Sequence, residues 1–396
     1  MRRPVPELFA LLFLVEVVHW AIVPLAPRFA DEFGLSTVQT GAILAATSIV
    51  SVLVAIPAGV LTDRLGPRPI TIVAAVLATT GTAGQAVAVD FWSLFGARAV
   101  FGAGFAIIWT AGLVWLGAVV SGPVRARALG STITTAGVGG LVGPALTGLL
   151  AEHVGLPVPF VLAAAALAVA TAVLVLPAPG LVTPPSERAP LRLRATIGRA
   201  RRDRVVLAGF AATALGGLTA GVVSLLVPLQ LDTNGLSEGS IGIVFSAGAG
   251  IFVVASALIA RHGDRTARIR TVGLAAGALA AVLVLLLVSE ATAVVVAFVL
   301  LRTPVMATLF TVSFPLAAMG ARRAGVGEGA VLGLLNMSWG VSTMVGPLVG
   351  GAVADALGYA AAYGAVLGFA VAVACWALLA ARAERETAAA PVPVRS

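Results

Sequence analysis

The sequence turns sharply at Gly59-Val-Leu-Thr-Asp-Arg-Leu-Gly-Pro-Arg68, a short charged segment between two long uncharged ones. The uncharged segments cover residues 33–62 and 69–89. A helix of roughly 20 residues crosses the hydrocarbon core of a membrane, so each segment is long enough to span it once. This part of the chain therefore predicts two transmembrane helices joined by a tight, charged turn.

The whole chain has the composition of a membrane protein. Of its 396 residues, 59% are hydrophobic and only 11% are charged, whereas a soluble domain needs about a quarter of charged residues to cover its surface. The basic residues are scattered between apolar runs, which argues against a nucleic-acid partner despite the net charge of +8. Cys375 is the only cysteine, and the histidines never occur at metal-ligand spacing. We expect no metal, no cofactor and no enzymatic activity.

Uncharged runs of the same kind continue along the chain, and none alternates as the strands of a membrane β-barrel do. The first run is interrupted by Glu16 and His19. The runs cover residues 8–27, 33–62, 69–89, 99–124, 128–151, 156–185, 205–231, 239–260, 271–289, 303–321, 329–354 and 356–381. We therefore expect an all-α integral membrane protein with twelve transmembrane helices.

The arginines indicate which helix ends face the cytosol, because cytosolic loops carry the excess of basic residues. With the N-terminus inside, the inward segments hold nearly all of the 25 basic residues. Only Arg28 falls in an outward loop, while Arg98 and Arg302 lie within helices. We expect a multi-pass protein of the cell (plasma or inner) membrane with both termini cytosolic. Its arginines would then face the anionic inner leaflet of the lipid bilayer.

The chain also contains an internal repeat: matching segments lie roughly 200 residues apart and occur in the same order. The matches are residues 143–148 with 346–351, Glu152 with Asp355, Asp63 and Arg64 with Asp264 and Arg265, and Arg98 with Arg302. Such parallel repeats predict two six-helix bundles of the same orientation, with a substrate site between them near the membrane midplane.

The repeat also predicts the domain organisation. We expect the first bundle over residues 1–177, a basic cytosolic linker over 178–204, the second bundle over 205–381 and a short cytosolic tail over 382–396. The second part of the linker suits either a basic amphipathic helix on the inner leaflet or a solvated connection. Bundles of this kind can bury their polar groups as monomers.

The charged turn resembles the G-x-x-x-D-R-x-G-x-R loop of the major facilitator superfamily at every signature position. These positions are Gly59, Asp63, Arg64, Gly66 and Arg68. The resemblance implies a membrane transporter in which this loop latches the two halves on the cytoplasmic side and is released during transport. The second copy keeps Asp264 and Arg265 but lacks both glycines.

A second resemblance to the same family is Arg98 in a helix, followed four residues later by Gly102. An arginine within the membrane normally faces the bundle interior and has a partner. Counting helical rise from the expected boundaries places Arg98 and Glu16 both near the middle of the membrane, so we expect them to meet.

Glu16 is the only carboxylate inside any expected helix. It is therefore either a proton carrier or one member of a static ion pair with Arg98. His19 and Trp20 share its helix face; His19 is either a relay or a packed histidine, and Trp20 lines the cavity or packs.

A third motif closely matches the family's antiporter signature, G-x8-G-x3-G-P-x2-G-G, with Thr147 in place of one glycine. Its matching positions are Gly130, Gly139, Gly143, Pro144 and Gly148. Glycines along one helix face also permit close packing alone. The resemblance implies a proton-coupled exporter.

Arg302 and Asn336 project further polar groups near mid-membrane and, with Trp20, are the candidate substrate contacts. We expect a secondary transporter that works by alternating access and exports small hydrophobic or amphipathic molecules against protons, with the proton gradient as energy source. The alternatives are a proton symporter or uniporter for a sugar, organic acid or other small nutrient, and a non-transporting sensor on the same fold.

Overall fold

The computed structural model describes residues 5–120, 123–176, 193–262 and 266–389, and these ranges contain helices and no strand. The first half of the molecule comprises α1 (Val5–Phe33), α2 (Thr37–Leu65), α3 (Pro67–Ala86), α4 (Phe91–Ile107), η1 (Ile108–Gly112), α5 (Leu113–Val119), α6 (Pro123–Val154) and α7 (Val158–Val175). The second half comprises α9 (Arg204–Thr233), α10 (Glu238–Ala260), α11 (Ile269–Leu283), α12 (Leu285–Val288), α13 (Thr292–Arg323), α14 (Glu328–Leu357) and α15 (Tyr359–Ala389).

Eleven helical segments of the described chain are long and apolar enough to cross a membrane. Two of these segments join consecutive elements: α4, η1 and α5 form one, and α11 and α12 form another. The 20-residue α3 is not among the eleven. Its second half contains three threonines and Gln85, which lower its hydropathy.

The short helix α8 (Leu193–Ala200) lies between the two halves in the chain, within the expected basic linker. It packs against α14, and Arg199 Nη1 donates a hydrogen bond of 3.4 Å to the Gly325 carbonyl. Most of the rest of that linker, Asp264 and Arg265 of the second charged turn, and the end of the tail lie outside the described residues.

The turns that start equivalent helices are built alike in both halves. Gly34 before α2 and Gly235 before α10 have φ values of 60° and 86°, a region that favours glycine because it has no side chain. Two residues later, the Ser36 and Ser237 hydroxyls accept hydrogen bonds from the third residue of each helix, as N-caps do. The sequence repeat is therefore also a repeat of local structure.

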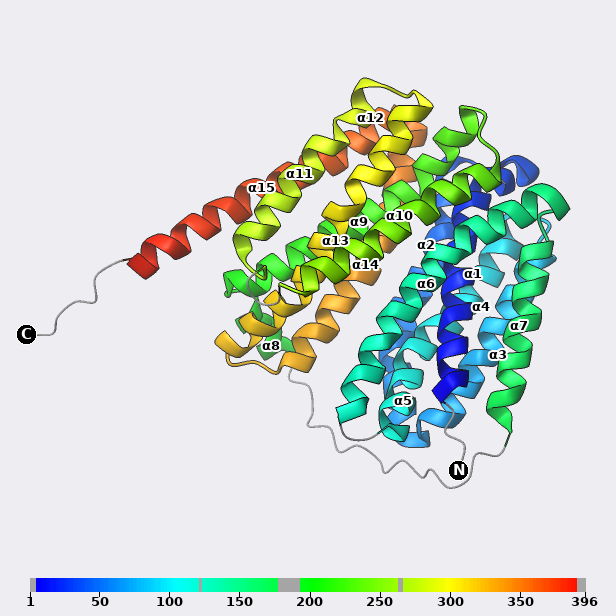
Figure 1. Cartoon of the computed structure of the whole chain (residues 1–396), viewed down its shortest axis with the longest axis horizontal. Helices are drawn as coiled ribbons and strands as arrows, with labels where there is room; N and C mark the ends of the chain where they lie inside the picture. The colour runs from blue at the N-terminus through cyan, green and yellow to red at the C-terminus, as the bar shows by residue number, and fades with distance from the viewer. Residues whose placement is uncertain (1–4, 121–122, 177–192, 263–265, 390–396) are drawn as a thin grey trace, which may run out of the picture.

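The two halves lie side by side (Figure 1). They converge at the end of the molecule where α1 ends, here called the Arg28 end. They diverge toward the opposite end, called the Arg68 end, where α1 begins (Figure 1). The two most extensive contacts between the halves are made by α2 with α14 and by α6 with α10. The first pair is the α2–α14 seam and the second the α6–α10 seam.

The seams close the Arg28 end through backbone contacts at small residues. In the α6–α10 seam, Gly242 packs directly against the Pro144 carbonyl, and the Ala145 amide donates a hydrogen bond of 2.9 Å to Ser246 Oγ. In the α2–α14 seam, Gly41 packs against the Pro347 carbonyl. Small residues let helix backbones approach closely in a membrane, which explains the tight seams.

The α2–α14 seam ends part of the way along α2. Ser48 and Thr343 share a hydrogen bond of 3.0 Å, and Val52 packs near Gly340. Beyond these contacts, toward the Arg68 end, Leu53 is 68% exposed. The halves therefore touch at one end of the molecule and separate toward the other.

Candidate functional site

Glu16 lies in the middle of α1 and is 6% exposed, the only buried acidic side chain among the described residues. Its two carboxylate oxygens accept hydrogen bonds from two indoles. Trp20 Nε1 donates to Oε2 at 3.2 Å, and Trp109 Nε1 donates to Oε1 at 3.0 Å. Indole nitrogens can only donate, so both contacts leave the carboxylate without a neutralising charge.

Trp109 reaches Glu16 where the segment formed by α4, η1 and α5 changes its winding. The π-helix η1 (Ile108–Gly112) interrupts the α-helical run between α4 and α5. A π turn takes in an extra residue and rotates the side chains that follow, and such turns recur at functional sites. Sequence periodicity gives no signal for this insertion, so Trp109 is not among the site residues predicted from the sequence.

The antiporter-type glycines bring α6 onto the same face of α1. A Cβ atom at Gly139 would lie 2.6 Å from Glu16 Cβ, and one at Gly143 would lie 2.8 Å from the Val17 carbonyl oxygen. Thr147, which replaces a signature glycine, donates its hydroxyl to the Gly143 carbonyl at 2.8 Å. Any side chain at Gly139 or Gly143 would force α1 and α6 apart.

The remaining glycines of this motif have other neighbours. Gly148 packs against the Glu238 backbone at the start of α10, so it serves the α6–α10 seam and not the Glu16 site. Gly130 lies in the first turns of α6.

Arg98 does not pair with Glu16, contrary to the expectation from membrane depth. Its side chain is 1% exposed, Nη1 donates a 3.4 Å hydrogen bond to the Val18 carbonyl, and the guanidinium lies 5.4 Å from the Phe101 ring centroid. The described residues contain no ion pair between Arg98 and Glu16. Depth along the membrane fixes the height of a side chain but not the direction in which it points around its helix.

His19 packs against the Trp20 and Phe105 rings and makes no hydrogen bond with Glu16 or Arg98. Its ring stacks on Phe105 at a centroid distance of 4.7 Å. Its Nδ1 is buried and has no hydrogen-bond partner in the described structure. This geometry shows a packed histidine in this conformation.

We expect Trp109→Phe to lower the stability of the protein. The substitution keeps an aromatic ring but removes the donor to a buried carboxylate oxygen, which costs about 1–2 kcal/mol. The melting temperature in detergent measures this loss. Trp92→Phe is the matched control, because Trp92 is 74% exposed and meets the Phe91 ring edge-on. Equal changes in the two variants would contradict the role of the Trp109 hydrogen bond.

The charged turn between α2 and α3 lies at the Arg68 end. Gly66 has φ 85° and allows the tight turn, while a Cβ atom at Gly59 would contact nothing within 4 Å. Arg68 Nη2 donates a 3.1 Å hydrogen bond to the Leu176 carbonyl at the end of α7, so it binds within the first half. Arg64 is exposed and Asp63 is partly buried.

The second-half candidates differ in their surroundings. Arg302, on α13, is partly buried with its guanidinium 5.9 Å from the Phe298 ring centroid. Asn336, on α14, is exposed and makes no hydrogen bond within the described chain. Trp339, one turn further along α14, meets the Phe310 ring edge-on at a centroid distance of 5.4 Å.

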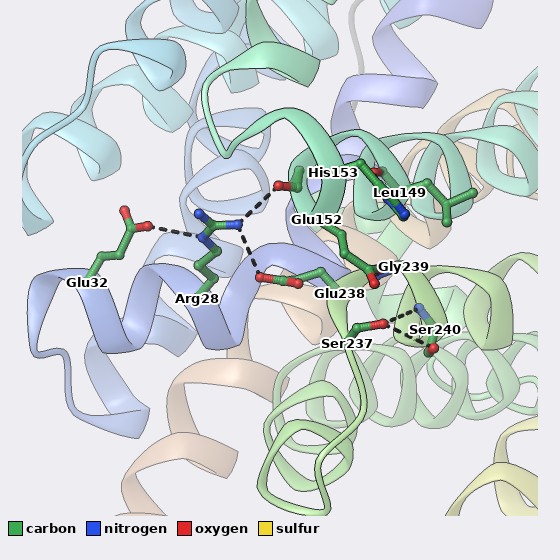
Figure 2. A network of polar contacts seen from close by, with 10 residues as sticks. Arg28, Glu32, Leu149, Glu152, His153, Ser237, Glu238, Gly239 and Ser240 are labelled. Atoms are coloured by element: carbon green, nitrogen blue, oxygen red, sulfur yellow. Dashed lines mark hydrogen bonds and ion pairs between the residues drawn. The ribbon is translucent and has the colours of Figure 1, made fainter.

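Charged side chains reinforce the closed Arg28 end (Figure 2). Arg28 donates to Glu32 at 3.1 Å, to the Ala151 carbonyl at 3.1 Å and to Glu238 of the second half at 3.4 Å. Figure 2 shows Arg28 on α1 reaching toward the end of α6 and the start of α10. Arg28 therefore links the two halves at this end.

Two carboxylates cap helices of the opposite half. Glu152, near the end of α6, accepts a 3.1 Å hydrogen bond from the Gly239 amide in the first turn of α10. Asp355, near the end of α14, accepts bonds of 3.1 and 2.9 Å from the Thr37 and Val38 amides in the first turn of α2. Free amides and the helix dipole both favour a carboxylate at these positions. The two caps are equivalent positions of the repeat.

The fold of two helix bundles and the motifs within it define a membrane transporter. A family model, the Major Facilitator Superfamily, matches residues 8–331. The chain belongs to the Major Facilitator Superfamily and is a multi-pass membrane transporter.

The relatives by sequence are transporters. The chain is 25% identical to the multidrug resistance protein MdtG of Escherichia fergusonii over 64% of each chain. It is 28% identical to the vesicular acetylcholine transporter of Rattus norvegicus over 56% of this chain and 42% of that one. A probable vesicular acetylcholine transporter-B of Danio rerio is 30% identical over 39% and 33% of the two chains. The matched regions thus cover less than two thirds of the length of these relatives.

Solved structures share the fold at low sequence identity. A bacterial homologue of the human lysosomal transporter Spinster, in an inward-facing and occupied conformation, superposes with a TM-score of 0.75 at 14% identity. The match covers 96% of this chain and 98% of the other. The nucleoside transporter NupG gives the same TM-score at 12% identity, over 95% and 99% of the two chains.

Proposed function

We propose that this protein is a proton-coupled exporter of small amphipathic compounds, with Glu16 as the proton carrier. The observation that carries the proposal is the Glu16 site: a buried carboxylate held by two neutral indoles, with no ion pair. Intramembrane carboxylates are costly and mark proton and substrate pathways. A carboxyl group bound only by neutral donors can gain and lose a proton without breaking a salt bridge.

The antiporter-type glycines support the direction of transport. Gly139 and Gly143 pack against the part of α1 that carries Glu16, so any movement of α6 against α1 acts on the carboxylate. The name of the relative MdtG, a multidrug resistance protein, also favours export.

The arginines support an orientation of the protein with the Arg68 end in the cytosol. Arg64, Arg68, Arg322 and Arg323 lie at the Arg68 end, and basic residues favour the cytosolic side. With this end in the cytosol, the chain has twelve transmembrane helices, including α3, and both termini are cytosolic. The protein lies in the cell (inner) membrane, and a closed Arg28 end is the inward-facing state of an alternating-access cycle.

Proton movement in proteoliposomes loaded with a pH-sensitive dye tests the proposal. Addition of an exported amphiphile to wild-type protein is expected to drive proton flux in the direction opposite to the substrate. Glu16→Gln keeps the size and one oxygen acceptor for an indole but cannot ionise, so its flux is expected to fall to that of protein-free liposomes.

Glu7→Gln is the control, because Glu7 lies in the first turn of α1, about two and a half turns before Glu16. It is expected to retain flux. Wild-type flux in Glu16→Gln would refute the proton-carrier role, and flux in the same direction as the substrate would indicate symport.

A further inference from the structure

Arg302 is an intramembrane cation for which the described protein provides no acceptor. It lies in the eleventh position of the 32-residue α13, well inside the helix. It makes neither a hydrogen bond nor an ion pair with the described chain, and its buried Nε atom has no partner. Its guanidinium lies 5.9 Å from the centroid of the Phe298 ring. An arginine in the membrane normally pairs with a carboxylate or a carbonyl, so this guanidinium lacks a partner that it needs.

The charge balance at the middle of the membrane is positive. Arg98 and Arg302 occupy equivalent positions of the two halves, and Arg98 does have an acceptor, the Val18 carbonyl. Glu16 is the only buried carboxylate among the described residues and pairs with neither arginine. In a medium of low dielectric constant, an excess positive charge attracts an anion strongly.

An apolar face continues from Arg302 along α13. Met306 and Phe310 follow at intervals of four residues, which places them on neighbouring positions of one helix face. This stripe extends about 12 Å from Arg302 to Phe310. Met306 and Trp339 both lie against Gly216 of α9, and Trp339 contacts the Phe310 ring.

The stripe runs toward the separated end of the molecule. α13 begins near the Arg28 end, where Asn234 donates to the Glu290 carbonyl just before the helix, and ends at Arg323. Phe310 therefore lies nearer the Arg68 end than Arg302 does. Phe310 and Trp339 are both partly exposed, so an apolar body could lie against them while a charged head extends deeper, to Arg302.

We propose that Arg302, Phe310 and Trp339, packed over the buried Met306, form the substrate subsite of the second half, and that its substrate is an amphipathic anion. A carboxylate or similar oxyanion of the substrate accepts hydrogen bonds from the guanidinium, which binds such groups through two parallel N–H donors. The aromatic side chains contact the apolar body. This inference rests on the proposed export function. It adds that the exported substrate is an anion.

Three ligands with one ring system and different charges test the assignment: 2-naphthoate, 2-naphthalenemethanol and 2-naphthylmethylamine. Equilibrium dialysis against the full-length protein in lipid nanodiscs, with empty nanodiscs subtracted, measures binding of each. The wild type is expected to bind the naphthoate about tenfold or more tightly than the alcohol, which is the usual effect of a charge-assisted hydrogen bond. The amine is expected to bind most weakly.

Variants of Arg302 separate recognition from folding. Arg302→Gln is expected to lose the preference for the naphthoate while its affinity for the alcohol stays unchanged, and Arg302→Lys is expected to recover part of the preference. Arg270→Gln, at an exposed position at the start of α11, is the control and is expected to bind as the wild type does.

Three results would overturn the assignment: a wild-type affinity for the naphthoate no higher than for the alcohol, an unchanged preference in Arg302→Gln, or an equal loss for both ligands. Equilibrium binding needs no proton gradient. Failure of the anion assignment is therefore distinguishable from failure of proton-coupled export, which the Glu16→Gln flux measures.

Discussion

Gly242→Leu is expected to open the Arg28 end and to abolish transport. Gly242 packs against the Pro144 carbonyl, so even a Cβ atom would overlap backbone that cannot rotate away. A leucine fits at this position only if α6 and α10 move apart. The α6–α10 seam can then no longer close. The arrangement with a closed Arg28 end would then be inaccessible, and the proposed cycle between two arrangements would stop.

Distances between spin labels at the Arg28 end measure the opening. Val154→Cys on α6 and Val288→Cys on α12 provide labelling sites on the two halves, since both valines are exposed, at 63% and 73%. The exposed Cys375 must first be replaced by serine. The label distances in Gly242→Leu are expected to shift to longer values than in the parent.

The matched control is Gly364→Leu on α15, where an added side chain meets no atom within 4 Å. It is expected to keep both the parent distances and the parent transport rate. If Gly242→Leu retained the parent distances, the tight glycine contact would not determine closure of this end.

Gly139→Leu is expected to destabilise the protein and to break the hydrogen bonds between Glu16 and the two indoles. A Cβ atom there would lie 2.6 Å from Glu16 Cβ and 3.0 Å from the Phe13 carbonyl oxygen, so the larger side chain must push α1 away from α6. Overpacking of this kind costs on the order of 1–3 kcal/mol. The displacement also moves the carboxylate away from Trp20 and Trp109, and substrate-driven proton flux is expected to fall to the background.

Thermal unfolding in detergent and the dye-based flux assay together check this prediction. Gly96→Leu, in the same half, is the control, because a side chain at Gly96 meets nothing within 4 Å. Gly139→Ala is expected to show a smaller loss of stability than the leucine variant. Normal flux in a folded Gly139→Leu protein would mean that α6 does not need to contact the Glu16 face.

The sequence predicted the helical membrane fold and its family well, because both depend on features that a linear pattern records. Long apolar runs and the signature residues of the charged turn require no knowledge of packing. The family match over residues 8–331 confirms this resemblance. The eleven candidate spans agree with the expected runs apart from α3.

The details of the site were harder to predict. Rise per residue placed Glu16 and Arg98 at similar depth but gave no information about rotation around their helices, and the expected contact between them was wrong for this conformation. Trp109 was missed because a single π turn redirects it. The caps by Glu152 and Asp355 were visible only as matched positions of the repeat, since the amides that they bind belong to helices far away in the sequence.

The caps by Glu152 and Asp355 determine how easily mutation can change the stability of the closed Arg28 end. Their donors are main-chain amides of Gly239, Thr37 and Val38, and every residue type except proline provides such a donor. Side-chain substitutions other than proline therefore change only the acceptors, Glu152 and Asp355. The occupancy of the closed state can thus be adjusted in small steps at two positions, one in each half, without altering the residues that meet the substrate.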